Sequence, residues 1–209
     1  MMLQACGLAL ERGQRRLFSD LSLSVQSGHA LCVVGPNGAG KTSLLRVLAG
    51  LLSPSEGRVT WRGQTWLADR ETLHRELLYV GHQSGLKDDL SAIENVQFSS
   101  ALRGVACSVA QAREALAQAG LAGKAGLPVR CLSQGQRRRV LLSQLLLQPR
   151  PGLAVLDEPF NALDQGAARW LSSSLVAWLT GGGVLVYTTH QPAALPESIE
   201  QTLPLGKGT

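Results

Sequence analysis

Long hydrophobic runs are absent from this sequence. No stretch approaches the ~18 apolar residues of a membrane-spanning helix, and residues 140–147, among the longest runs, are interrupted by Ser143 and Gln144. The first residues, MMLQAC, have neither a basic start nor a long apolar stretch, so we expect no signal peptide. These absences predict a protein that stays in the cytoplasm and meets a membrane only through a partner.

Cysteine motifs and aromatic residues are also scarce. The four cysteines form no C-x-x-C pair and have no metal-ligand spacing, so we interpret them as reduced and mostly structural. Aromatic residues make up 4% of the chain, and few lie near the arginines that dominate its net charge of +5. A nucleic-acid surface usually combines such charges with stacking aromatics. We therefore interpret the arginines, including the run 137–139, mainly as solvated charge and expect no nucleic-acid partner.

The chain does contain enough apolar residues for one sizeable domain. It has 209 residues, 44% of them hydrophobic, with no repeat, low-complexity segment or linker. Apolar runs at 30–34, 77–80, 153–156 and 184–189 read as buried strands. Residues 2–10 and 21–26 read as an antiparallel pair, and 58–61 as another strand.

The segment from 84 to 148 has a helical pattern and follows a short predicted helix at 69–76. Ser91 and Ser108 are predicted N-caps, the latter with Gln111 completing a capping box. We expect a single domain over 1–209. Its α/β core and β subdomain would comprise about 1–83 and 149–209, with a helical insertion at about 84–148.

The clearest motif is the sequence GPNGAGKT at residues 35–42, which fits G-x-x-x-x-G-K-[ST]. A buried strand precedes it and an apolar helical segment follows it. Such a loop aims backbone N–H groups at phosphates, and the helix N-terminus adds a positive dipole. Lys41 can reach the terminal phosphates, and the Thr42 hydroxyl is placed to bind Mg²⁺. The predicted nucleotide-binding residues are Gly35, Pro36, Asn37, Gly38, Ala39, Gly40, Lys41, Thr42 and Ser43.

Two adjacent acids follow the buried strand at 153–156. Asp157 occupies the position that holds the water shell of Mg²⁺ beside the P-loop threonine. Glu158 would point the opposite way if the strand geometry continued, which makes it our predicted general base for an attacking water. A plain strand cap is the alternative, although two acids after a buried strand are costly without a function.

Two further polar residues follow predicted strands. His190 comes directly after the run 184–189, and we predict that it orients the γ-phosphate and Glu158, although a single histidine is more often structural. Gln83 follows the run 77–80, where an uncharged amide could reach Mg²⁺ and the attacking water. Its alternative role is that of a polar loop residue.

Residues 132–136 read LSQGQ and combine a serine, a glycine and a helix N-terminus into a second anion-binding surface. Together with Gln83, 157–158, 161–164 and His190, all in order, they make the chain resemble the ATP-binding cassette (ABC) family over nearly its whole length. Gln83 matches the Q-loop, 132–136 the C-motif, 161–164 the D-loop and His190 the switch histidine. The resemblance implies an α/β P-loop NTPase (RecA-like) core with an antiparallel β subdomain and an inserted helical subdomain.

The resemblance also implies a head-to-tail homodimer with two ATP molecules at its interface. Each ATP would lie between the P-loop of one subunit and Ser133, Gly135 and Gln136 of the other. Two positions depart from the family pattern: Gln134 replaces a usual glycine, and Arg12 stands where an aromatic usually stacks on adenine. A guanidinium can still stack on a base, so we expect Arg12 to contact it, with loose base selectivity.

Within the family, the chain resembles ATP-binding subunits of the haem exporter of bacterial cytochrome c maturation. The resemblance rests on residues 35–51, 79–87, 90–96 and 132–140. It implies a haem-transporting ATPase at the cytoplasmic face of the inner membrane, bound peripherally to a membrane-spanning permease whose docking site lies near 84–104. The sequence has no C-x-x-C-H motif and no His/Cys pair at ligand spacing, so no direct haem binding is expected.

Other functions remain open from the sequence. The chain could be the ATPase of a different small-molecule exporter, or a soluble ABC ATPase acting on nucleic acid or ribosomes. The soluble class usually has tandem cassettes, long coiled coils or a basic arm, and none of these is present. A module that holds ATP without hydrolysing it is disfavoured by Lys41, Asp157, Glu158 and His190.

Overall fold

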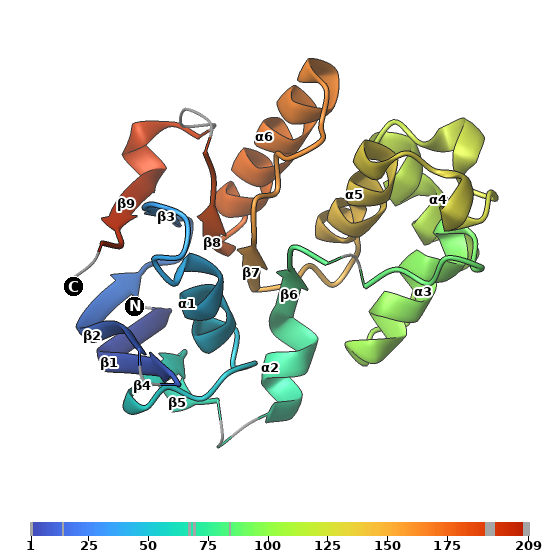
Figure 1. Cartoon of the computed structure of the whole chain (residues 1–209). Coiled ribbons are helices and arrows are strands. Elements are labelled where there is room, and N and C mark those ends of the chain that lie inside the picture. Colours follow the sequence, from blue (N-terminus) through green and yellow to red (C-terminus); the bar gives the residue numbers. More distant parts are fainter. Residues whose placement is uncertain are drawn as a thin grey trace.

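A computed structural model describes residues 2–13, 15–66, 68, 70–83, 85–190 and 195–206. Two sheets lie beside each other on one side of the molecule, and a group of helices lies on the other (Figure 1). Asp69 and Ser84, which begin the predicted helix and the predicted insertion, lie outside the described residues.

The N-terminal sheet is antiparallel, with strand order β2-β1-β4-β5. Its strands are β1 (Leu3–Arg12), β2 (Arg15–Val25), β4 (Glu56–Trp61) and β5 (Gln64–Thr65). Strands β1 and β2 extend further than the sequence predicted and form a hairpin whose last pair is Arg12 and Arg15. This hairpin brings Arg12 toward the loop after β3.

The second sheet is parallel, with strand order β6-β7-β8-β3-β9. Its strands are β3 (Ala30–Val34), β6 (Leu77–Val80), β7 (Leu153–Leu156), β8 (Val184–Thr188) and β9 (Glu200–Pro204). The near-continuous apolar runs of β3, β7 and β8 suit strands that are covered on both faces. Because neighbouring strands are parallel, the loops after β3, β6, β7 and β8 meet at one edge of the sheet.

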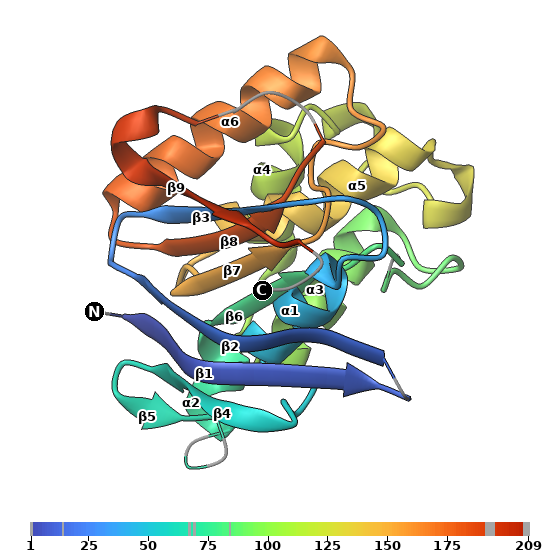
Figure 2. The same cartoon turned by 60° about the vertical axis from the view of Figure 1, so that its left-hand side comes forward.

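Helices cover the two faces of this parallel sheet. Helix α1 (Lys41–Leu48) packs in the apolar cluster shared by the two sheets, and α6 (Gln165–Thr180) packs in a second cluster on the opposite face. Figure 2 shows α6 above the parallel sheet and the antiparallel sheet below it. The Asp164 carboxylate caps α6 by accepting from the Ala167 N–H at 2.8 Å.

The helical part packs around its own apolar cluster between residues 92 and 147. It contains α3 (Ala92–Leu102), α4 (Val109–Gln118) and α5 (Gln134–Leu142), while α2 (Arg70–Glu76) precedes β6. The capping roles of Ser91 and Ser108 are confirmed, and both caps are complete capping boxes. None of the helices in the described ranges combines the length and apolar character that a membrane span requires.

Two sequence-based interpretations of α5 were wrong. The helix does not run to Leu147: it ends at Leu142 and continues as a 3₁₀ turn, where the Ser143 hydroxyl bonds the Val140 carbonyl at 2.8 Å. The arginine run 137–139 is not simply solvated charge either. All three side chains are half-buried and donate to backbone carbonyls, because the helix turns them toward neighbouring loops.

Candidate nucleotide-binding and catalytic site

The loop between β3 and α1 is shaped to receive an anion. Gly40 is the N-cap of α1, with φ of 101°, and no side chain caps the helix, so its first N–H groups face the loop. The Lys41 ammonium donates to the carbonyls of Gly35 at 2.7 Å and Pro36 at 3.2 Å. A Cβ on Gly35 would lie 2.1 Å from the Leu205 carbonyl oxygen, so this position requires glycine. The loop therefore concentrates positive charge at the edge of the sheet.

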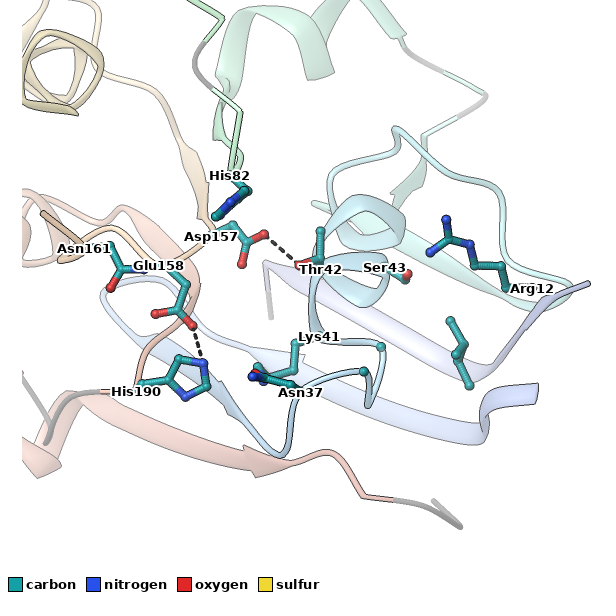
Figure 3. Close-up of a pocket in the computed structure, with 13 residues that line it drawn as sticks. Arg12, Asn37, Lys41, Thr42, Ser43, His82, Asp157, Glu158, Asn161 and His190 are labelled. Atoms are coloured by element: carbon teal, nitrogen blue, oxygen red, sulfur yellow. Dashed lines mark hydrogen bonds and ion pairs between the residues drawn. The ribbon is translucent and has the colours of Figure 1, made fainter. Parts of the chain in front are cut away.

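This loop forms one wall of a cavity of about 370 Å³. Figure 3 shows Lys41 and Thr42 in its middle, Arg12 at one end, and Glu158 and His190 at the other. The lining residues come from five segments of the chain: they are Arg12, Leu17, Asn37, Gly38, Gly40, Lys41, Thr42, Ser43, His82, Asp157, Glu158, Asn161 and His190. The cavity thus brings together most of the predicted site residues. Of the P-loop residues, Gly35, Pro36 and Ala39 do not line it, and Ala39 is buried in the apolar cluster shared by the two sheets.

Asp157 is the most constrained carboxylate of the site. It is 4% exposed, and its oxygens accept from the Thr42 hydroxyl at 2.8 Å and the Thr188 hydroxyl at 2.7 Å. Thr188 also accepts from the Glu158 N–H at 2.9 Å. This hydroxyl therefore joins Asp157 to Glu158. The sequence does not indicate this role, because a threonine at the end of a β-strand is common.

Glu158 and His190 lie in contact at one end of the cavity. The Glu158 Oε1 atom lies 3.2 Å from His190 Nε2, and the two side chains are 13% and 56% exposed. The condition attached to the predicted direction of Glu158, that the strand geometry continues, is not met. Strand β7 ends at Leu156, and Glu158 has φ of +51°, in the left-handed region that non-glycine residues rarely adopt. This turn, rather than strand alternation, directs the carboxylate to His190, and strained backbone of this kind is concentrated at functional sites.

The loop after β6 divides its two polar residues between two cavities. His82 lines the 370 Å³ cavity that holds the P-loop, although it was not among the predicted site residues. Gln83 instead lines a separate cavity of about 340 Å³ between β6 and α3, together with Leu102 and Arg103. The structure therefore does not bring Gln83 beside Thr42 and Asp157.

The C-motif lies outside the 370 Å³ cavity. Ser133 is the N-cap of α5 and forms a reciprocal capping box with Gln136, with bonds of 3.3 and 3.0 Å. A Cβ on Gly135 would lie 2.4 Å from the carbonyl oxygen of Ala162, so the C-motif packs tightly against the D-loop. Within one chain, Ser133, Gly135 and Gln136 do not line the cavity that holds the P-loop.

The end of the cavity farthest from Glu158 is formed by the β1–β2 hairpin. Arg12 and Leu17 line it, and the Arg15 guanidinium donates to the Gly38 carbonyl at 3.3 Å. Arg12 therefore lies in the same cavity as the P-loop, and its contact with a base stays a prediction. Arg15 and Leu17 were missed, because only the pairing register of the hairpin shows which of its residues face the P-loop.

Comparison with known proteins agrees with this geometry. A sequence profile of the ABC transporter family matches residues 18–161. The chain belongs to this family. Its relatives include the cytochrome c biogenesis ATP-binding export protein CcmA of Aromatoleum aromaticum, 48% identical over 200 residues that cover 95% of this chain and 94% of the relative. CcmA of Pseudomonas aeruginosa is 45% identical, covering 98% and 100% of the two chains. Family membership makes the chain an ATP-hydrolysing subunit.

Solved structures show the same ABC ATPase fold. A putative ABC transporter ATP-binding protein from Pyrococcus furiosus aligns with a TM-score of 0.84 at 20% identity, covering 98% of each chain. A dimeric ATP-binding cassette in a post-hydrolysis state, bound to ADP and Pi, aligns with a TM-score of 0.81 at 24% identity, covering 91% of this chain and 88% of that one. The predicted fold class, a P-loop core with an antiparallel sheet and inserted helices, is confirmed.

Proposed function

We propose that this chain hydrolyses Mg²⁺-ATP as the peripheral subunit of a haem exporter in bacterial cytochrome c biogenesis, at the cytoplasmic face of the inner membrane. The cytochrome c biogenesis proteins to which the chain is 45–49% identical support the pathway. The observation on which the chemistry depends is the single cavity in which the P-loop, Asp157, Glu158 and His190 meet. We propose the whole chain as one cassette, with the insertion at about 84–148 as its helical subdomain.

The residues present fit a magnesium ion. Mg²⁺ prefers oxygen ligands and usually keeps several waters. The Thr42 hydroxyl and the Asp157 carboxylate lie 2.8 Å apart beside the phosphate loop, so Thr42 would bind the ion directly and Asp157 its water shell. When bound, the ion would neutralise charge on the terminal phosphates. We propose that Gln83 joins this set only when the loop after β6 moves, since its side chain lines the neighbouring cavity.

Glu158 and His190 can activate water at the other end of the phosphate site. The Glu158 carboxylate is the more shielded member of this pair, and His190 Nε2 lies close enough to orient it. A positioned carboxylate can act as a general base toward water. We propose that Glu158 takes the proton of the attacking water. His190 would hold Glu158 through Nε2 and contact the γ-phosphate with its exposed ring.

The C-motif supports a head-to-tail dimer. Ser133, Gly135 and Gln136 surround the N-terminus of α5, yet they do not contribute to the cavity of their own chain. A helix N-terminus with its backbone N–H groups is a favourable site for phosphate. We propose that these residues contact the γ-phosphate of ATP bound to the P-loop of a second copy, so that ATP completes both sites.

The surface beside Gln83 supports docking of a permease. Phe98 and Leu102 of α3 are 39% and 68% exposed, so this helix presents two large apolar side chains to solvent. Leu102 and Gln83 line the same 340 Å³ cavity, so a docked membrane partner would touch the loop that leads to the nucleotide site. Through this loop, a docked permease could influence ATP hydrolysis. This coupling requires neither haem nor nucleic acid to bind this chain.

The proposal is tested by pulling down the full chain from detergent-solubilised membranes of cells that make it with its native neighbours. We expect a multi-spanning membrane protein to co-purify and ATP to be hydrolysed. Glu158→Gln should lower the hydrolysis rate by about 10²- to 10⁴-fold while leaving ATP bound. The matched control is Glu114→Gln, because Glu114 is exposed on α4 and far along the chain from the site.

Two results would overturn the proposal. If the chain co-purified with RNA or ribosomes instead of a membrane protein, the soluble alternative would replace the exporter. If Glu158→Gln hydrolysed ATP as fast as Glu114→Gln, the assignment of the general base would be wrong whatever the partner.

A further inference from the structure

Three consecutive arginines of α5 bond in different directions. Arg137 donates to the Leu132 carbonyl at 3.2 Å and to the Asp88 carboxylate at 3.1 Å. Arg139 donates to the Ala119 carbonyl at 3.1 Å. Both arginines therefore bond partners within the helical subdomain, where they join the end of α4 and the loop before α3 to α5.

Arg138 bonds outside the helical subdomain. Its guanidinium donates to the Gly81 carbonyl at 2.9 Å and to the Asp157 carbonyl. Gly81 directly follows β6 and Asp157 directly follows β7, so one side chain bridges two adjacent strands of the parallel sheet from α5. The planar guanidinium suits this task because its donors form a rigid fork, which a lysine cannot reproduce.

Arg138 lies close to Asp157 and Glu158. It lines a cavity of about 480 Å³ together with His82, Asp157 and Glu158. Burial lowers the pKa of Arg138, and the nearby carboxylates of Asp157 and Glu158 oppose that shift. A desolvated charge of this kind is retained where specific partners compensate it. Its position is therefore sensitive to any displacement of α5 relative to the ends of β6 and β7.

We infer that Arg138 is a positioning residue that transmits the position of the C-motif helix to the strand end bearing Asp157 and Glu158. Ser133 caps the same helix five residues earlier, about 7.5 Å along its axis. In the proposed dimer, Ser133 contacts ATP bound to the second copy. Arg138 would thus couple closure on one ATP to the alignment of Glu158 at the other. This inference rests on the proposed function, because it requires ATP hydrolysis by a dimer.

The test compares Arg138→Gln with Arg139→Gln in the full chain co-purified with its membrane partner. Both variants remove one half-buried guanidinium from the same helix, but Arg139 bonds only carbonyls of the helical subdomain. We expect Arg138→Gln to lower kcat about 10- to 100-fold, since small displacements of catalytic groups have effects of this size. KM for ATP should stay within about 2-fold, because the P-loop is untouched. Arg139→Gln should keep most of the wild-type kcat.

A third variant, Arg138→Lys, keeps the charge but replaces the rigid guanidinium fork with a single ammonium nitrogen, which cannot reproduce the same two-carbonyl geometry. We expect its kcat to lie between those of wild type and Arg138→Gln, at unchanged KM and with a thermal midpoint close to that of Arg139→Gln. This variant decides the question if Arg138→Gln does not fold. Wild-type activity in Arg138→Lys, or equal kcat in Arg138→Gln and Arg139→Gln, would overturn the inference. An inactive wild-type assembly would instead refute the proposed function.

Discussion

The hydroxyl of Thr188 bonds both Asp157 and Glu158, so the positions of these two acidic residues depend on it. It donates to the Asp157 carboxylate at 2.7 Å and accepts from the Glu158 N–H at 2.9 Å, and the residue is fully buried. Thr188→Val keeps the shape of the side chain but removes both bonds. A hydrogen bond to a charged group contributes about 1.5–3 kcal/mol, and a donor left unpaired costs about 1–3 kcal/mol. We expect a net loss of about 2–4 kcal/mol in the free energy of unfolding.

The stability part of this prediction is measured by thermal and guanidinium unfolding. For a domain of 150–250 residues, a loss of about 1 kcal/mol lowers Tm by about 2–4 °C, so the expected decrease is about 4–16 °C. The matched control is Thr180→Val at the exposed end of α6, where the hydroxyl donates only to the Val176 carbonyl at 2.9 Å. That variant should stay within about 0.5 kcal/mol of wild type.

The activity part concerns the alignment of Glu158. Without Thr188, the Glu158 N–H has lost the partner that fixes its left-handed turn, so the carboxylate should move relative to His190. We expect ATP hydrolysis to fall about 10- to 100-fold. A Thr188→Val protein that unfolds within about 0.5 kcal/mol of wild type and hydrolyses ATP normally would refute this reasoning.

Two further predictions concern the base end of the cavity and the edge of the parallel sheet. Arg12→Ala should raise KM for ATP about 2- to 30-fold, the range expected for losing a cation–π contact, and Arg12→Tyr should restore the wild-type KM. Both are checked by measuring the hydrolysis rate against ATP concentration. An unchanged KM in Arg12→Ala would contradict the proposed contact between Arg12 and the base. Burial raises the pKa of Glu200, although its bond from the Tyr187 hydroxyl at 2.9 Å opposes the shift. Because the unfolded chain then binds fewer protons, stability should fall as pH rises above about 4.5. Glu200→Gln should remove this contribution to the slope of the free energy of unfolding against pH, measured by unfolding at several pH values. If the wild type and Glu200→Gln had the same pH profile, this prediction would be wrong.

Elements with a local signal could be predicted from the sequence. The P-loop and its flanking strand and helix follow from GPNGAGKT. The N-caps at Ser91 and Ser108, and the capping box of Ser108 with Gln111, follow from residues a few positions apart. The apolar runs of β3, β7 and β8 identify buried strands whose carboxyl ends carry Asp157 and His190. Each of these features depends on neighbours within a few positions along the chain.

Contacts between distant segments could not be predicted. The role of Thr188 requires β7 and β8 to be adjacent, and the role of Arg138 requires α5 to lie against the ends of β6 and β7. The direction of Glu158 depends on a left-handed residue that strand periodicity does not indicate. Gln83 lines a cavity different from that of its neighbour His82, because the loop after β6 separates the two side chains.

The two halves of the site differ in how firmly they are held, and the difference bears on control of hydrolysis. Asp157 is buried and fixed by Thr42 and Thr188, so these two residues are already in place beside the P-loop within one chain. The His190 side chain is 56% exposed, and the C-motif of the same chain does not reach it. A second copy that covered this open half would exclude water and strengthen the contact between Glu158 and His190. We therefore expect ATP binding to need little help from a second copy, and hydrolysis to depend on it, so that the rate per subunit should rise steeply with protein concentration.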